Sequence, residues 1–221
     1  MILLLKKCPL FAGMSESDIE NCLSCSGSKA VSYQKGESIF LQQDAPEKLY
    51  ILLEGSVSVC SDSVSGKRSI VTTITCPGEL FGEVLLFINR TEYFHYAQAA
   101  EPVRVLEMPK EFLYHTCGRN CGYHTRLISN MLSILAQKAY YLNRRLQVLS
   151  CGTLRQKIAC FLFQDTGGAA SSMNREELAD FLNAARPSLS RELMKMQDEG
   201  LLRIDRRSIQ LLDKEKLQNI L

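Results

Sequence analysis

Basic and hydroxyl side chains recur between residues 186 and 195 at a spacing that places them on one face of a helix. Arginine presents forked donors that match the O6 and N7 acceptors of guanine, whereas lysine and serine reach phosphate oxygens. The pattern therefore predicts contact with double-stranded DNA in the major groove. The outward residues that we expect to make this contact are Arg186, Ser188, Arg191 and Lys195.

Two short helices must position these side chains. Asn174, followed three residues later by Glu177, forms a capping pattern that begins a helix. Asn183 can take the left-handed conformation of a tight turn, Pro187 suits the first position of a second helix, and Gly200 ends that helix. Two helices joined in this way form a helix-turn-helix. The second helix is expected to bury Leu189, Leu193 and Met196.

A basic hairpin is expected directly after the helix pair. Segments 201–204 and 208–212 read as two strands joined by Asp205, Arg206 and Arg207. The tip, with Arg206 and Arg207, can lie beside the phosphate backbone as in a winged helix. The alternative is a helix pair that packs within the protein without binding DNA, and the hairpin makes this alternative less favourable.

Apolar residues recur with a 4-3-4-3-4-3 spacing before this region and form an a/d seam on a long helix. The surrounding segment 118–150 contains five Lys or Arg and no Asp or Glu. A seam of this kind predicts pairing with an identical helix, hence a homodimer; the alternative is a helix lying on its own domain's core. The seam residues are Ile128, Leu132, Leu135, Ala139, Leu142, Leu146 and Leu149.

The N-terminal half has the two-residue periodicity of β-strands. Short apolar segments at 38–41, 49–53, 56–60, 70–74 and 103–108 alternate with turn signals. Many short strands at this spacing indicate an antiparallel sandwich or barrel. The sequence thus predicts an α+β chain with a β-rich domain at 1–117, a dimerisation helix at 118–150 and a DNA-binding domain at 151–221.

Two motifs are the most specific in the chain: Pro77-Gly78-Glu79-Leu80-Phe81-Gly82-Glu83 and Arg186-Pro187-Ser188-Leu189-Ser190-Arg191-Glu192-Leu193. Through them, and over nearly all of its length, the chain resembles the Crp/Fnr family of bacterial regulators. In that family a jelly-roll domain of the cyclic-nucleotide-binding type, called a β-roll, feeds a long dimer helix and a winged helix-turn-helix. The resemblance implies a homodimeric transcription regulator on an inverted-repeat operator, with RNA polymerase as a further partner if it activates.

The resemblance also implies roles for individual residues at the DNA. Arg186, Pro187 and Arg191 would face base edges, with Ser190 beside them, and Asn174, Arg175 and Ser188 would lie nearer the phosphates. Pro187 stands where the best-known members carry a glutamate that accepts a hydrogen bond from cytosine. Because proline has no such acceptor, we expect a different operator at that base pair.

The second departure from the family concerns the effector. Gly82 and Glu83 match the pair that binds ribose in members that bind cAMP, but Tyr93 and Phe94 stand where those members carry an Arg-Ser pair for the cyclic phosphate. A phosphate needs a cation and fixed donors, so we expect that cAMP is not the effector. An apolar or aromatic ligand and simple filling of the roll by aromatic rings both stay open. The expected pocket comprises Phe81, Gly82, Glu83, Tyr93, Phe94 and Tyr96.

Thiols and imidazoles offer weaker candidates for a metal or redox site. A group within ten residues could bind zinc or, in part, haem, although its spacing matches no standard site; it comprises His115, Cys117, Cys121 and His124. Cys8, Cys22 and Cys25 invite comparison with family members that hold an iron–sulfur cluster. Packing as small apolar side chains is the alternative for all of them.

An enzyme and a membrane protein are both disfavoured. A metal-dependent enzyme on a cupin-like barrel needs two histidines and a carboxylate on inward strands, and only His95 lies in the strand-rich part. No apolar run reaches the ~18 residues of a membrane span, and Lys6 and Lys7 follow the apolar residues 1–5 instead of preceding them as in a signal peptide. We therefore expect a cytoplasmic regulator without enzyme activity, controlled by an effector or redox signal, or a regulator that needs no ligand.

Overall fold

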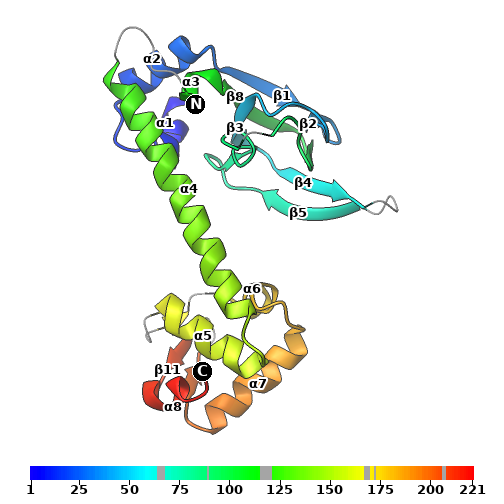
Figure 1. Ribbon diagram of the computed structural model, residues 1–221, viewed down its shortest axis with the longest axis vertical. Helices are drawn as coiled ribbons and strands as arrows, with labels where there is room; N and C mark the ends of the chain where they lie inside the picture. Colours follow the sequence, from blue (N-terminus) through cyan, green and yellow to red (C-terminus); the bar gives the residue numbers. More distant parts are fainter. Residues whose placement is uncertain (64–67, 89, 115–120, 167–169, 172, 206–207) are drawn as a thin grey trace. The chain divides into compact units, whose positions relative to one another are not determined.

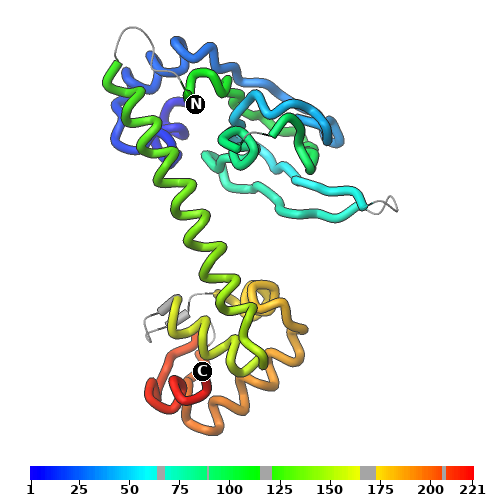
Figure 2. The backbone as a smooth tube through the Cα atoms, viewed as in Figure 1, coloured from blue at the N-terminus to red at the C-terminus, as the bar shows by residue number. Residues whose placement is uncertain are grey.

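The computed structural model describes residues 1–63, 68–88, 90–114, 121–166, 170–171, 173–205 and 208–221 of the 221-residue chain. The chain divides into two compact units, Met1–Ala136 and Gln137–Leu221 (Figure 1). Among the described residues, no helix has both the length and the apolar character needed to cross a membrane. The boundary between the units falls within the long helix α4 (Gly122–Leu149), which Figure 2 traces without a break.

The first unit begins with short helices: α1 (Ile2–Leu5), the 3-10 turn η1 (Pro9–Phe11) and α2 (Glu16–Ser26). The Ser15 hydroxyl accepts a hydrogen bond from the backbone N–H of Asp18, whose carboxylate in turn accepts from the Ser15 N–H. This capping box begins α2 where the Ser15–Asp18 spacing predicts a helix start.

Two four-stranded antiparallel sheets form the body of this unit. One has the order β1 (Lys29–Tyr33), β8 (Val103–Pro109), β3 (Lys48–Glu54) and β6 (Leu80–Phe81). The other has the order β2 (Ser38–Phe40), β7 (Tyr96–Ala99), β4 (Val57–Asp62) and β5 (Arg68–Ile74). The prediction of an antiparallel β-roll is therefore confirmed.

Strand β3 shows why the sequence folds into two layers. Leu49, Ile51 and Leu53 belong to the apolar cluster formed with the helices. The alternate residues Tyr50 and Leu52 belong to a separate cluster between the two sheets. Because successive side chains of a strand point to opposite faces, this one strand contributes to two cores.

Helix α3 (Glu111–Tyr114) precedes α4. The first half of α4 packs, through Leu127, Met131 and Ile134, on the apolar cluster that β3 forms with the helices. The side-chain amide of Asn130 donates to the carbonyl oxygens of Leu10 and Ala12, both at 2.9 Å. These bonds fasten the helix to the N-terminal segment, so packing and polar contacts together fix its first half.

The second unit contains α5 (Leu154–Thr166), α6 (Arg175–Phe181), α7 (Arg186–Asp198) and α8 (Lys214–Gln218). A small antiparallel sheet has the order β10 (Leu202–Ile204), β11 (Ile209–Leu211) and β9 (Ala170–Ser171). The predicted hairpin is thus confirmed, and β9 adds a third strand that was not predicted. The helices and the sheet share one core, which includes the fully buried Leu178, Leu193 and Leu202.

Replacing Asn130 by alanine tests the attachment of α4. The variant N130A loses two hydrogen bonds and leaves two carbonyls without this donor, so the free energy of unfolding should fall by about 1–3 kcal/mol. Urea unfolding followed by circular dichroism measures this change. The control S129A alters the exposed neighbouring residue and should differ from the unmodified chain by less than ~0.5 kcal/mol. Equal stabilities of the two variants would contradict this role of Asn130.

Candidate nucleic-acid interface

The helix pair begins with the predicted cap. Oδ1 of Asn174 accepts from the backbone N–H groups of Glu176 and Glu177 at 2.9 and 3.0 Å, and the Glu177 carboxylate accepts from the Asn174 N–H at 2.9 Å. The side-chain oxygen of Asn174 is therefore occupied in holding α6. Only its amide group is left to meet an acceptor such as a phosphate oxygen.

The turn between the helices also follows the prediction. Asn183 has φ +49°, the left-handed conformation that asparagine tolerates better than most residues. Helix α7 begins at Arg186, so Pro187 occupies its second position instead of the expected first. The difference has no energetic cost, because the N–H groups of the whole first turn lack helical partners.

Helix α7 separates an apolar face from a basic one, as predicted. Leu189, Leu193 and Met196 are fully buried on one side. On the other, four residues are exposed and two serines are half-buried: Arg186, Pro187, Arg191 and Lys195, then Ser188 and Ser190. The guanidinium of Arg191 donates to the Pro187 carbonyl oxygen at 3.4 Å and to the Ser188 hydroxyl at 3.5 Å. Bonds of this length in an exposed place are readily exchanged for contacts with a nucleic acid.

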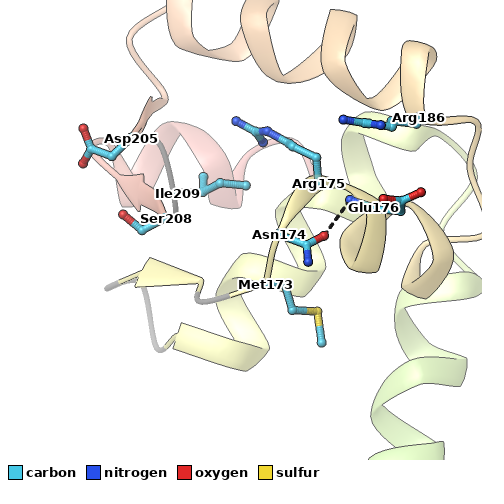
Figure 3. Close-up of a pocket in the computed structure, with 8 residues that line it drawn as sticks. All are labelled: Met173, Asn174, Arg175, Glu176, Arg186, Asp205, Ser208 and Ile209. Atoms are coloured by element: carbon cyan, nitrogen blue, oxygen red, sulfur yellow. Dashed lines mark hydrogen bonds between the residues drawn. The ribbon is translucent and has the colours of Figure 1, made fainter.

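A hollow of about 280 Å³ lies between the start of α6, the start of α7 and the hairpin (Figure 3). Arg175 extends into it toward Ser208 and Ile209. Burial lowers the pKa of Arg175, and its buried Nη1 atom has no hydrogen-bond partner among the described residues. A guanidinium with an unmet donor is suited to a phosphate oxygen. The lining residues are Met173, Asn174, Arg175, Glu176, Arg186, Asp205, Ser208 and Ile209.

The hairpin beside this hollow pairs Leu202 with Leu211 and Ile204 with Ile209. The N–H of Asp205 donates to the Ser208 carbonyl oxygen at 2.9 Å. Arg206 and Arg207, the predicted basic tip, lie outside the described residues.

Arg155 connects α5 to α7 through two carboxylates. Its Nε donates to Glu192 at 2.5 Å, and its two Nη atoms donate to the two carboxylate oxygens of Glu199, both at 2.8 Å. These carboxylates raise the pKa of Arg155, and Arg155 lowers that of Glu199. Sequence reasoning missed this bridge because its partners are 37 and 44 residues away. Glu192 and Glu199 stand seven residues apart in the sequence, and this spacing, which places two carboxylates on one helical face, is the signal that could have indicated such a bridge.

The predicted seam of α4 lies mostly outside the face that packs on the first unit's core, although one of its residues, Leu135, also packs against that core. Leu132, Leu142 and Leu146 have exposed fractions of 64%, 57% and 64%. Ala139 is also exposed, and Ile128, Leu135 and Leu149 are half-buried. A continuous apolar row on one helix is thus left largely uncovered by its own chain.

Four residues of the expected effector pocket come together in the β-roll. Phe81 and Tyr93 are buried between the sheets, and an added Cβ at Gly82 would stand 3.5 Å from the Tyr93 hydroxyl. Glu83 is 3% exposed. The pKa of Tyr93 is raised mainly by burial and, second, by the nearby carboxyl of Glu83. The Tyr93 hydroxyl is buried and has no hydrogen-bond partner among the described residues.

The structure does not bring Phe94 and Tyr96 to this cluster. Phe94 is 48% exposed, and its ring lies 5.3 Å from the guanidinium of Arg90. The hydroxyl of Tyr96 donates to Asp62 at 3.0 Å on the neighbouring strand. The stacking partner of Tyr93 is instead Phe40, with 4.1 Å between ring centroids. The two adjacent aromatics thus differ in environment, with Tyr93 buried and Phe94 exposed.

The suggested metal site is described only in part, since His115 and Cys117 lie outside the described residues. The Cys121 thiol contacts the Tyr123 hydroxyl, and the buried His124 ring has its Nε2 atom 3.1 Å from the Phe112 carbonyl oxygen. In the part of the chain that is described, no three His, Cys, Asp or Glu residues are grouped so as to hold a metal ion.

The N-terminal cysteines differ in accessibility. Cys8 and Cys22 are buried, and burial raises their pKa values to about 11 and about 12. Cys25 is exposed. Two of the three therefore behave as packing residues, which is the alternative that the helical pattern of α2 favours.

Comparison with known proteins places both units in known families. Residues 30–120 match the cyclic nucleotide-binding domain, and residues 156–220 match the Crp-like helix-turn-helix domain. The transcriptional regulator LdrP of Thermus thermophilus is 30% identical over 84% of this chain and 93% of its own. The cyclic AMP receptor protein of the same organism is 25% identical over 98% of each chain. The crystal structure of Thermus thermophilus catabolite activator protein is similar with a TM-score of 0.54 and 25% identity, covering 96% of this chain and 97% of that one.

The Arg155–Glu199 pair predicts a pH dependence of stability. Because Arg155 holds the pKa of Glu199 below its ordinary value of 4.5, the pair stabilises the folded chain above about that pH and loses this effect as the pH falls through the folded pKa. The variant E199Q should therefore be less stable than the unmodified chain at pH ~7, with the difference shrinking below pH ~4.5.

Thermal unfolding across this pH range measures the effect. The control D198N removes the adjacent exposed carboxylate on α7 and should show a difference that changes little with pH. A gap between E199Q and the unmodified chain that stays constant down to pH ~3 would contradict the assignment.

Proposed function

The chain belongs to the Crp/Fnr family of DNA-binding transcription regulators, and we propose that it acts as a homodimer on an inverted-repeat operator. In this proposal residues 1–117 sense a signal, residues 118–150 pair the two copies, and residues 151–221 contact DNA. The observation that carries it is the basic face of α7, with Arg186, Arg191 and Lys195 exposed opposite fully buried leucines.

At the DNA, each side chain has a role that its position supports. Arg186 and Arg191 would read base edges from the first half of α7, because the N-terminal residues of a recognition helix reach deepest into the major groove. Arg175, whose Nη1 atom has no partner among the residues that the structure describes, and the half-buried Ser188 would contact phosphates. Pro187 offers no side-chain acceptor, so the operator position beneath it would be read through shape and apolar contact.

The exposed seam of α4 supports the homodimer. Large apolar side chains left exposed in a row on one helix are costly in water, and an identical helix alongside removes them from solvent. Two-fold pairing also presents two copies of α7 with the same symmetry as an inverted repeat. A regulatory signal would act by changing the spacing of these copies, which must fit one turn of DNA, about 34 Å.

The β-roll supports a signal other than a cyclic nucleotide. A cyclic phosphate needs a cation and fixed donors, but the residues gathered around Tyr93 are the uncharged rings of Phe40, Tyr50 and Phe81, with the carboxyl of Glu83 beside them. These side chains do not fit a bound phosphate. The Tyr93 hydroxyl, which has no hydrogen-bond partner in the described part of the chain, suits a small aromatic ligand with one polar group.

A regulator that needs no ligand is the second candidate, and the aromatic stacking favours it. The rings of Phe40, Tyr50, Phe81 and Tyr93 lie in successive contact, with centroid distances of 4.1 to 5.4 Å. Rings packed in this way already fill the space between the sheets.

Selection of bound duplexes from a random pool tests the proposed function. We expect enrichment of an inverted repeat whose half-sites lie one helical turn apart, with the same yield in the presence and absence of cAMP. A pool without any enriched sequence would contradict sequence-specific binding. Stronger enrichment with cAMP would contradict our reading of the roll.

Alanine substitutions on α7 should separate base reading from phosphate contact. R186A and R191A should each cost about 1–3 kcal/mol of binding to the selected operator and relax preference at one position. K195A should weaken binding to all sequences alike. It should also reduce the slope of log affinity against log salt concentration by about 1, the value expected for one lost phosphate contact. Fluorescence anisotropy at several salt concentrations measures both effects. K35A, which removes an exposed charge from the first unit, should leave affinity unchanged; an equal loss in K35A would mean that only net charge matters.

Charged substitutions in the seam should prevent pairing. L142E or L146E would place a carboxylate in the paired interface, so sedimentation velocity should show a monomer under conditions in which the unmodified chain is a dimer. N143E adds the same charge at the adjacent exposed position and should remain dimeric. Unchanged dimers in both seam variants, with helix content preserved, would show that the copies do not pair along this row.

A further inference from the structure

Two thiols are in contact where α4 is followed by α5. Cys151 lies in the turn two residues after Leu149, the last residue of α4, and Cys160 lies on α5. Their side chains contact each other, and both are half-buried. Contact between two cysteine side chains nine residues apart brings together the two atoms that a disulfide would join.

Two glutamines hold this contact in place. The side-chain amide of Gln164 donates to Oε1 of Gln147 at 2.8 Å and to Sγ of Cys160 at 3.4 Å. The Cys151 thiol donates to the backbone carbonyl oxygen of Gln147 at 3.5 Å. Each thiol is thus hydrogen-bonded to one of two glutamines, and the two glutamines are hydrogen-bonded to each other. These bonds, from α4 and from α5, hold the two sulfurs close together.

The charges around the pair assign different roles to the two thiols. Burial, followed by the neighbouring Cys151, raises the pKa of Cys160 to about 11, against an opposing effect of the Arg144 guanidinium. A raised pKa means less thiolate at neutral pH, and the thiolate is the attacking species. Burial therefore disfavours Cys160 as the first attacker, and we assign the first step to its contact partner Cys151. In the second step Cys160 attacks a sulfur that it already contacts, so a small thiolate fraction suffices.

We propose that Cys151 and Cys160 form a reversible modification site whose substrate is a hydroperoxide. In the first step the Cys151 sulfur attacks the peroxide; an S–O bond forms, the O–O bond breaks, and water or an alcohol leaves, giving a sulfenic acid. In the second step the Cys160 sulfur attacks the oxidised sulfur; the S–S bond forms, the S–O bond of the sulfenic acid breaks, and its hydroxyl group leaves as water with the proton of the Cys160 thiol. Two thiols are oxidised and one peroxide is reduced, and a dithiol reductant reverses the change.

The position of the pair gives the oxidation a structural consequence. A disulfide would close a loop of about ten residues across the joint between α4 and α5. On one side of that joint lies the end of the seam helix; on the other, α5 carries Arg155, which holds α7 through Glu192 and Glu199. The oxidised chain should exchange backbone amide hydrogens more slowly across residues 150–160.

A second thiol pair provides an internal comparison. Cys25 and Cys121 both contact the hydroxyl of Tyr123, so their thiols meet through that hydroxyl. A disulfide between them requires Tyr123 to move aside. We therefore expect Cys151 and Cys160 to be oxidised first.

Peptide mapping after limited treatment with hydrogen peroxide tests the proposal on the full chain. Trypsin cleaves after Arg145, Arg155, Lys157 and Arg175, so residues 146–155 and 158–175 form separate peptides. We expect them to appear as one linked species, about 2 Da lighter than their sum, which a dithiol reductant separates. Linked peptides from Cys25 and Cys121 instead, or Cys151 oxidised to sulfinic acid without a link, would overturn the proposal.

Counting thiols in the variants adds a second readout. The unmodified chain has nine thiols and should lose two of them. C151S should lose none under the same treatment, and C160S at most one, because Cys151 without its partner stops at the sulfenic acid. Either variant can replace the other if it folds poorly. C76S, which removes an exposed thiol from the first unit, should still lose two. A loss of two thiols in both C151S and C160S would overturn the proposal whether or not the chain binds DNA.

Discussion

Helix α4 carries two apolar faces, and its own chain covers only one of them. Leu127, Met131 and Ile134 are buried against the first unit, while the exposed leucines of the seam lie on another side of the same helix. The proposed pairing of two copies, and with it the proposed mode of DNA binding, depends on this uncovered face. Exposed apolar area on a well-formed helix favours association, and a second copy of the same helix offers the complementary surface. The two-fold symmetry of the proposed operator follows from that pairing.

The same helix links two units that have independent cores. The first unit fixes α4 by apolar packing and by the bonds of Asn130 to the N-terminal segment. In the second unit, Val148 near the end of α4 belongs to the core that supports α7. A change in how two copies of α4 pair would therefore reach α7 through buried side chains, which transmit displacement because protein interiors are closely packed.

Local patterns made most of the DNA-binding unit predictable. The cap at Asn174, the left-handed Asn183 and the buried leucines of α7 depend on residues within a few positions of one another, so their types and spacing determine them. The antiparallel strands were predictable from their alternation for the same reason. The family motifs added the pairing of a sensor with a winged helix-turn-helix.

Features that depend on distant partners were not predictable. Strand β9 exists because it pairs with β11 across more than thirty residues of chain, and its small residues alone indicate a loop. Arg155 finds its carboxylates on another helix. Tyr93 and Phe94 are equivalent in type, and only the three-dimensional path of the chain decides that the first is buried and the second exposed. Contacts of this kind are set by tertiary packing, on which a local pattern carries no information.

Hydroxyl-radical footprinting on the selected operator tests the central claim most directly, because it reports the number and spacing of protein contacts on the duplex. We expect two equivalent protected segments with centres about 10 base pairs apart, or a multiple of that distance, related by the two-fold axis of the site. One protected segment at saturating protein, or two whose separation does not match a whole helical turn, would contradict it.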